Sequence, residues 1–159
     1  MTEAYLGLGT NLGNRLANLR QARRLLAQIP GTRVARTSLV YETEPVGGVV
    51  QDDYLNQVVV VTTILAADAL LRRLHDIEQA LHRQRIVRWG ARTVDLDLLY
   101  YDNLSVQTPE LTVPHPQIAN RRFVLVPLLE VATGERINEV AALLQATPDQ
   151  HWVRPYQEK

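Results

Sequence analysis

Side chains suited to binding phosphate are concentrated between residues 83 and 97, which read RQRIVRWGARTVDLD. The first ten of these residues contain no acidic side chain but four arginines: Arg83, Arg85, Arg88 and Arg92. The planar guanidinium group of arginine offers paired donors that match phosphate oxygens. This segment therefore predicts a site for a ligand that carries phosphate groups.

Two carboxylates follow the arginines. Asp95 and Asp97 fall on an expected strand, where the two-residue period turns both side chains toward one face of the sheet, about 7 Å apart along the chain. Carboxylates at this spacing can hold one or two Mg²⁺ ions, which complete their coordination with water and substrate phosphate oxygens. Together with the arginines they favour magnesium-assisted transfer of a phosphate-containing group, in which positioning and charge neutralisation supply most of the catalysis.

The same residues also allow simpler interpretations. An Asp-x-Asp pair alone is typical of a solvated strand face, and an arginine such as Arg85 or Arg88 can belong to an ordinary exposed loop. The apolar neighbours of the two aspartates favour an internal strand: Val94, Leu96, Leu98 and Leu99. Two carboxylates buried so close together are unfavourable unless a cation or arginines neutralise them.

The composition excludes several kinds of enzyme. The 159 residues include no cysteine, two serines and a single lysine, Lys159. Thiolate catalysis, Schiff-base chemistry on lysine, a P-loop lysine and a GxSxG serine elbow all lack their key residue. The length and the apolar content of 46% predict one domain, residues 1–159, that needs no disulfide.

Charge and hydropathy favour neither a nucleic-acid nor a membrane partner. Seventeen basic and seventeen acidic residues leave a formal net charge of zero. The longest apolar run, 58–67, is interrupted by two threonines and is much shorter than the roughly 20 residues of a membrane helix. The N-terminus lacks the basic and apolar regions of a signal peptide. We therefore expect a cytoplasmic protein without a nucleic-acid or membrane partner, and we expect it to be a monomer.

Hydrophobic periodicity and turn residues outline the elements that must position these groups. The expected order is strand 4–8, a helix from about residue 16 that ends at Pro30, strand 34–42, strand 54–63, helix 66–82 and strand 94–101. This βαββαβ order predicts a ferredoxin-like core, an α/β (α+β) fold with a mainly antiparallel sheet. Short helices at 123–131 and 139–144 would cover the second face and complete a three-layer α-β-α sandwich.

Two further positions allow more than one interpretation. Tyr54 and Asn56 share one face of the third strand, where they could bind a flat heterocycle or simply pair across strands. His115 lies between two prolines and is either a plain loop histidine or a ligand contact. Neither position identifies a function without the neighbouring segments.

Taken together, several segments resemble a known family of folate biosynthesis, the 6-hydroxymethyl-7,8-dihydropterin pyrophosphokinases (2-amino-4-hydroxy-6-hydroxymethyldihydropteridine diphosphokinases). The resemblance runs from Leu6 to about Leu129 and includes, in order, GLGTNLGN, YETEPVG, DYLNQVV, IEQALHRQR, RWGARTVDLDLL and LTVPHPQIANRRFVLVPL. The RWG-RT-DLD block joined to the VPHP and NRRF segments is highly specific. The sequence departs from the pattern at Ala91, where the family often has proline. It also departs at Glu110 and His75, two positions that affect single ATP contacts but not the aspartate pair.

The resemblance implies Mg²⁺-dependent transfer of the β,γ-diphosphoryl group of ATP, the co-substrate, to the hydroxymethyl oxygen of the pterin, giving AMP and the pterin diphosphate. By position, Asp95 and Asp97 would bind two Mg²⁺ ions, and Arg83 and Arg92 would join them in catalysis. The resemblance places these residues around ATP: Glu78, Arg85, Trp89, Arg92, Leu98, Thr112, His115 and Arg121. It places these around the pterin: Thr43, Val46, Tyr54, Asn56 and Phe123.

Non-catalytic proteins share the expected order of elements. RNA-recognition modules also run βαββαβ, and ferredoxin-like regulatory domains bind small molecules without reacting them. An RNA-binding sheet carries stacked aromatic residues, of which the third strand here offers only Tyr54. Neither alternative accounts for an Asp-x-Asp pair beside an arginine loop. Of the two tryptophans, we expect Trp89 to lie in that loop and Trp152 to lie in a tail remote from the site.

Overall fold

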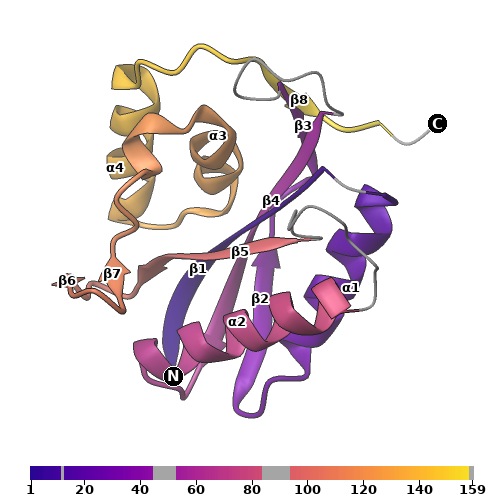
Figure 1. The fold of residues 1–159 in the computed structure, drawn as a ribbon. Helices are drawn as coiled ribbons and strands as arrows, with labels where there is room; N and C mark the ends of the chain where they lie inside the picture. The colour runs from indigo at the N-terminus through magenta and orange to yellow at the C-terminus, as the bar shows by residue number, and fades with distance from the viewer. Residues whose placement is uncertain (12, 45–52, 84–93, 158–159) are drawn as a thin grey trace.

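The computed structural model describes residues 1–11, 13–44, 53–83 and 94–157, with only the backbone at residue 83. The elements follow in the order drawn in Figure 1: β1 Thr2–Thr10, α1 Arg15–Ala27, β2 Thr32–Thr37, β3 Tyr41–Thr43, β4 Tyr54–Thr63, α2 Ala67–Arg83, β5 Asp95–Tyr101, β6 Val106–Gln107, β7 Thr112–Val113, a 3₁₀ turn Ile118–Asn120, α3 Arg122–Val131, α4 Glu135–Ala146 and β8 Val153–Pro155. The mixed α/β fold expected from the sequence is confirmed.

The main sheet has the strand order β5-β1-β4-β3-β8, and β2 pairs with β4. β2 and β3 lie one after the other along the same edge of β4, whose other edge pairs with β1. Every pairing among the described strands is antiparallel. The prediction of a mainly antiparallel sheet is therefore confirmed.

The second expected strand, 34–42, is divided into β2 and β3, so the prediction of one continuous strand was wrong. Ser38 lies at the division. Its N–H donates to Val58 O at 2.9 Å, its hydroxyl accepts from Val58 N–H at 3.0 Å, and its carbonyl accepts from Gln57 Nε2 at 2.7 Å. These bonds satisfy polar groups at the division, which follows a register shift between Val34 and Arg36. The segment 34–42 contains neither glycine nor proline, the residues that usually mark a break, so the sequence pattern conceals the division.

Helices cover both faces of the sheet (Figure 1). On one face α1 and α2 bury leucines such as Leu19 and Leu74. On the other, α3 buries Leu125 and Leu128, and α4 packs beside it. Side chains of β4 alternate between the two cores, so the run 58–61 is buried throughout. Among the described helices, none is both long and apolar enough to span a bilayer.

The chain after β5 contains elements that periodicity did not predict. β6 and β7 form a small hairpin, and β8 pairs with β3 at the edge of the main sheet. Each of these strands has two or three residues, too few for an alternating pattern to be recognised. The two tail helices are present, although α4 begins four residues before the expected 139.

The antiparallel registers bring the ends of four strands, β1, β3, β4 and β5, together at one end of the sheet. Gly9, near the end of β1, lies opposite Asn56 on β4 and opposite Asp95 at the start of β5. Thr43, at the end of β3, lies opposite Tyr54 at the start of β4. Residues from distant parts of the sequence therefore meet at this end of the sheet.

Candidate active site

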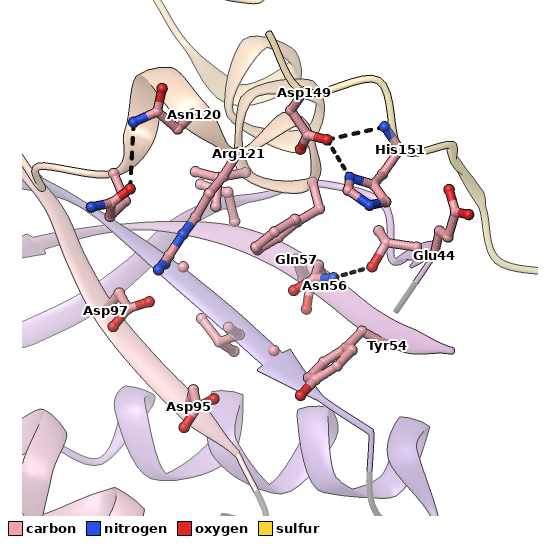
Figure 2. Close-up of a pocket in the computed structure, with 18 of the residues that line it drawn as sticks. Glu44, Tyr54, Asn56, Gln57, Asp95, Asp97, Asn120, Arg121, Asp149 and His151 are labelled. Carbon is pink, nitrogen blue, oxygen red and sulfur yellow. Dashed lines mark hydrogen bonds and ion pairs between the residues drawn. The ribbon is translucent and has the colours of Figure 1, made fainter. Parts of the chain in front are cut away.

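A cavity of about 540 Å³ opens at the end of the sheet where β1, β3, β4 and β5 meet, on the face that carries α3. Figure 2 shows Asp95 and Asp97 on one side, Glu44 and His151 on the opposite side, and Asn56 between them. The lining residues come from β1, β3, β4, β5, the turn before α3, α3 and the C-terminal tail: Gly7, Leu8, Gly9, Thr43, Glu44, Tyr54, Asn56, Gln57, Val58, Asp95, Asp97, Gln117, Asn120, Arg121, Phe123, Val124, Pro148, Asp149 and His151.

The two aspartates of β5 both line this cavity, as the two-residue period predicted. Asp95 is exposed and Asp97 is half-buried, whereas Leu96 between them is buried against the opposite core. Within the described part of the chain, no three His, Cys, Asp or Glu side chains gather into a metal-binding group. A pair of carboxylate ligands with open positions suits a hard cation that also takes water and phosphate oxygens, as Mg²⁺ does.

The floor of the cavity beside these aspartates is formed by two glycines of β1. Gly7 lies opposite Asp97, and Gly9 lies opposite Asp95. A Cβ atom on Gly9 would lie 2.7 Å from Asn56 Oδ1, closer than real Cβ contacts allow. The absence of a side chain at Gly9 therefore leaves room for the Asn56 amide.

The other end of the cavity is lined by aromatic and amide side chains. Asn56 Nδ2 donates to Thr43 Oγ1 at 2.7 Å, and both residues are buried. Having accepted this bond, the Thr43 hydroxyl can still donate its own hydrogen. Tyr54 and Phe123 also line the cavity, and burial together with the nearby Asp95 carboxylate raises the pKa of Tyr54. Donors, acceptors and ring surfaces at this end suit a flat, hydrogen-bonding heterocycle.

A second cavity of about 210 Å³ lies on the other side of Asp97. Its lining residues are Leu71, His75, Leu96, Asp97, Leu98, Leu111, Thr112, His115 and Pro116. Among the described residues these two cavities share one side chain, that of Asp97. Ligands in the two cavities would therefore both lie against this carboxylate.

His115 is held in a defined orientation at the second cavity. Its backbone N–H donates to Leu99 O on β5 at 2.9 Å, and its ring Nδ1 accepts from Gln117 N–H at 3.1 Å. Burial lowers the pKa of His115. The neutral ring that this favours carries its hydrogen on Nε2, because Nδ1 is an acceptor. His115 can therefore donate one hydrogen bond to a ligand without carrying charge.

Glu78 lines neither of the two cavities, although the resemblance places it near ATP. Its Oε2 accepts a hydrogen bond of 2.9 Å from the N–H of Leu96. Glu78 thus ties α2 to β5 between the two aspartates. Its contact with ATP stays a prediction.

The other residues expected from the sequence divide into three groups. Thr43, Tyr54, Asn56, Phe123 and Arg121 line the larger cavity. Leu98, Thr112 and His115 line the smaller one. The remaining positions lie outside the described residues: Val46, Arg85, Trp89, Arg92 and the side chain of Arg83.

Sequence reasoning missed the contribution of the C-terminal tail. Pro148, Asp149 and His151 line the larger cavity, and the backbone of Trp152 is hydrogen-bonded to Glu44 beside it. The prediction that Trp152 lies remote from the site was therefore wrong. Nothing in the hydropathy of the tail indicated this contact, since it joins residues that are 108 positions apart.

Residues 5–133 match the family model described as 7,8-dihydro-6-hydroxymethylpterin-pyrophosphokinase (HPPK). The chain belongs to this family. The resemblance recognised in the sequence is thereby confirmed, and the family is one of pyrophosphokinases, the class of transferase that was expected. The match ends before the tail that lines the larger cavity.

Similar proteins include two of nearly the same length. Both are named 2-amino-4-hydroxy-6-hydroxymethyldihydropteridine pyrophosphokinase. The protein of Bacillus subtilis is 42% identical over 156 residues, 98% of this chain and 91% of its own length. That of Methylorubrum extorquens is 44% identical over 149 residues, 91% of this chain and 94% of its own length.

Other relatives are longer. The bifunctional protein FolKE of Lactococcus lactis subsp. lactis is 42% identical over 131 residues, and the match spans 38% of that protein and 82% of this chain. A crystallised HPPK-DHPS in complex with substrates shares the fold with a TM-score of 0.69 at 13% identity, over 91% of this chain and 43% of its own. The wild-type HPPK-DHPS of Plasmodium falciparum has a TM-score of 0.65 at 15% identity, over 91% and 43% of the two chains. This chain thus spans about two fifths of the length of these relatives.

Proposed function

We propose that this chain transfers the β,γ-diphosphoryl group of ATP to the hydroxymethyl oxygen of 6-hydroxymethyl-7,8-dihydropterin, a step of folate biosynthesis. That oxygen attacks the β-phosphorus, the bond from the β-phosphorus to the α,β-bridging oxygen breaks, and the hydroxyl proton is released. The products are AMP and the pterin diphosphate. Family membership supports the reaction class, and the position of Asp97 in both cavities is the structural observation that carries the proposal.

The pterin occupies the larger cavity in this proposal. The rings of Tyr54 and Phe123 lie against its faces, and Thr43 and Asn56, with Val46, bind its edge. The buried Asn56–Thr43 hydrogen bond supports this assignment, because it fixes one acceptor and one donor before the ligand arrives. A pre-oriented pair of this kind favours a ring that carries both an amino group and a carbonyl group.

ATP occupies the smaller cavity and reaches the pterin at Asp97. Leu98, Thr112 and His115 line that cavity, and Arg121 extends from the start of α3 toward the Asp97 end of the larger one (Figure 2). The guanidinium group of Arg121 and the neutral Nε2–H of His115 are suited to phosphate oxygens. Glu78, Arg83, Arg85, Trp89 and Arg92 enter the proposal through the family resemblance alone.

Asp95 and Asp97 would hold two Mg²⁺ ions. When bound, these ions neutralise phosphate charge and make the hydroxymethyl oxygen more acidic. The contribution of the chain is geometric, since β5 turns both carboxylates into the cavity and the Glu78 bond to Leu96 fixes the strand between them. The two glycines of β1 keep the space in front of the carboxylates free of side chains.

Further features belong to the same proposal. We regard the scaffold as a ferredoxin-like βαββαβ core within a three-layer α-β-α sandwich, which the order of elements from β1 to β5 and the helices on both faces support. We also propose that residues 1–159 act as one pyrophosphokinase domain, as a monomer, on small molecules alone and in the cytoplasm.

Product analysis tests the proposed function. The chain is incubated with ATP and the reduced pterin, with and without Mg²⁺, and AMP and the pterin diphosphate are quantified. The proposal predicts equal amounts of the two products and no reaction after the metal is chelated. Formation of ADP in place of AMP, or AMP formation independent of the pterin, would contradict it.

A further inference from the structure

The C-terminal tail forms the outer wall of the larger cavity, although it lies beyond the segment matched by the family model. Its place is fixed by two hydrogen bonds to Glu44, the residue after Thr43. Glu44 N–H donates to Trp152 O at 3.2 Å, and Trp152 N–H donates to Glu44 Oε1 at 3.2 Å. β8 then continues these bonds by pairing with β3. The tail is therefore attached to the sheet beside Thr43, a residue expected to bind the edge of the pterin ring.

Asp149 organises this wall. Its side chain is 8% exposed and accepts hydrogen bonds from Arg122 N–H at 2.8 Å, from His151 N–H at 3.0 Å and from His151 Nδ1 at 2.5 Å. The bond from Arg122 satisfies an N–H at the start of α3, whose first turn carries Phe123. One buried carboxylate thus fixes both the imidazole of the tail and the helix end that carries the cavity's phenyl ring.

The bond to Asp149 determines what the rest of the His151 ring can do. Nδ1 carries the hydrogen that faces the carboxylate, so Nε2 is the remaining polar atom of the ring. Figure 2 shows the ring turned from the tail toward the side of the cavity that carries Glu44 and Asn56. In the charged ring Nε2–H is a donor. In the neutral ring with its hydrogen kept on Nδ1, the same atom can only accept.

Charge favours the donor form. The groups that face His151 are the carboxylates of Asp149 and Glu44 and the guanidinium of Arg122, which is bonded to the His151 carbonyl. The hydrogen bond from the ring to Asp149 raises the pKa of His151, and the charge of Glu44 acts in the same direction. The imidazolium therefore persists to a higher pH than in an ordinary histidine.

We propose that His151, oriented by Asp149, is a pterin-binding residue whose charged ring donates a hydrogen bond from Nε2 to an acceptor at the pterin edge, the ring carbonyl oxygen. The inference rests on the proposed function, because it takes the larger cavity to be the pterin site. Asn56 Oδ1 and Glu44 supply acceptors on this side and the Thr43 hydroxyl supplies one donor, so His151 Nε2–H adds a second, charged donor for a ring with both amino and carbonyl groups. Asp149 is the positioning residue of the pair.

Pterin binding should weaken as the pH rises, because His151 then loses the hydrogen on Nε2. Calorimetry of the full chain with the reduced pterin, from about pH 6 to about pH 9, spans a histidine whose pKa is raised from its ordinary value of about 6.5. We expect the wild-type Kd to increase about tenfold over this range, as for the loss of a charged hydrogen bond. His151→Gln should bind about tenfold more weakly at the low end and show little change with pH.

Two further variants separate binding from a structural role. Asp149→Asn keeps an acceptor for Arg122 N–H but turns its NH2 group toward His151 Nδ1, so the neutral ring can keep its hydrogen on Nε2 and the affinity should lose most of its pH dependence. Arg154→Ala is the matched control, because Arg154 also joins the tail to the sheet, through Glu42, but does not line the cavity. It should keep the wild-type pH profile. Thermal unfolding of each variant identifies any that fail to fold.

The outcomes distinguish the two proposals. A wild-type chain that does not bind the pterin at any pH contradicts the proposed function itself. A wild-type chain that binds with no pH dependence, or a His151→Gln variant that retains the wild-type affinity and pH profile, overturns the role of His151 alone. Should Asp149→Asn fail to fold, the comparison of wild type with His151→Gln still decides.

Discussion

The two sides of the larger cavity are built in different ways. The inner side is the sheet itself, in which Gly9, Asn56 and Asp95 occupy paired positions on adjacent strands. The outer side is the C-terminal tail, which is held by a few hydrogen bonds that converge on Asp149 and Glu44. A change on the inner side alters many paired contacts, whereas a change on the outer side alters only a few.

This difference suggests a division of labour within the site. Groups that react or neutralise charge must be held within fractions of an ångström, and a central antiparallel sheet provides such positions. Groups that adjust affinity can be carried by a less constrained segment. We therefore expect changes on the inner side to affect kcat or pterin KM strongly, and changes on the outer side to affect affinity and its pH dependence.

Loss of an aspartate of β5 should have the largest effect. Asp95→Ala or Asp97→Ala removes a ligand of the proposed ions, and kcat should fall by about 10² or more. Both variants should fold, because removing one of two adjacent carboxylates relieves repulsion. Steady-state kinetics at saturating Mg²⁺ measures the loss, with Asp76→Ala as the control, an exposed carboxylate on α2 that lines neither cavity. A β5 variant that keeps more than about a tenth of the wild-type kcat would exclude the role.

Gly9→Ala should weaken pterin binding because the added methyl group displaces the Asn56 amide. The added Cβ would lie 2.7 Å from Asn56 Oδ1, so the amide must leave its position, and we expect pterin KM to rise about tenfold, with kcat less affected. Gly7→Ala is the matched comparison on the same strand, because its Cβ would meet Leu99 at an ordinary 3.5 Å, and its effect should be smaller.

A double variant shows whether Gly9 acts through Asn56. In an Asn56→Ala background, Gly9→Ala should change pterin KM by less than about twofold, because the group that it displaces is already gone. Full additivity of the two changes would mean that Gly9 acts by another route.

Glu78 allows a test of positioning on the inner side. Its bond to Leu96 N–H fixes β5 between the aspartates, so Glu78→Ala should lower kcat by about threefold to tenfold, and Glu78→Gln, which keeps an acceptor, should restore most of it. A contact with ATP would act differently. Were Glu78→Ala to raise only the KM for ATP, the family-derived role would hold in place of this one.

The smallest expected effect is on thermal stability, measured as the Tm difference between wild type and Asp149→Asn on the outer side. Burial acts to raise the pKa of Asp149, but the hydrogen bonds from His151 and Arg122 lower it, while the bond to Asp149 raises the pKa of His151. The contribution of the pair is therefore lost as pH rises through the raised pKa of His151, and again as pH falls through the lowered pKa of Asp149. The Tm difference between wild type and Asp149→Asn should shrink from about pH 6 to about pH 9. A Tm difference that grows over this range would contradict the pairing.

The sequence predicted the inner side of the site because its information is local. The two-residue period alone turns Asp95 and Asp97 to one face, and the valine-rich run of β4 identifies a buried strand. The family resemblance then supplied residues that do line the cavities, such as Tyr54 and Phe123 in the larger and His115 in the smaller.

The outer side could not be predicted, because it depends on contacts between distant segments. β8 has three residues, and its pairing with β3 leaves no periodic pattern in the sequence. The bond between Trp152 and Glu44 connects positions 108 apart, which explains why Trp152 was expected far from the site. For Glu78, helical spacing identifies the face of α2 that carries it but not its bond to Leu96.

If ATP and the pterin meet at Asp97, the binding of one should depend on the other through this carboxylate. Calorimetry measures the Kd of the pterin with and without a non-hydrolysable ATP analogue and Mg²⁺, in wild type and in Asp97→Ala. We predict that the analogue strengthens pterin binding at least about fivefold in wild type, and that Asp97→Ala still binds each ligand alone but loses this enhancement. An Asp97→Ala variant that keeps the full enhancement would show that the two ligands do not meet at Asp97.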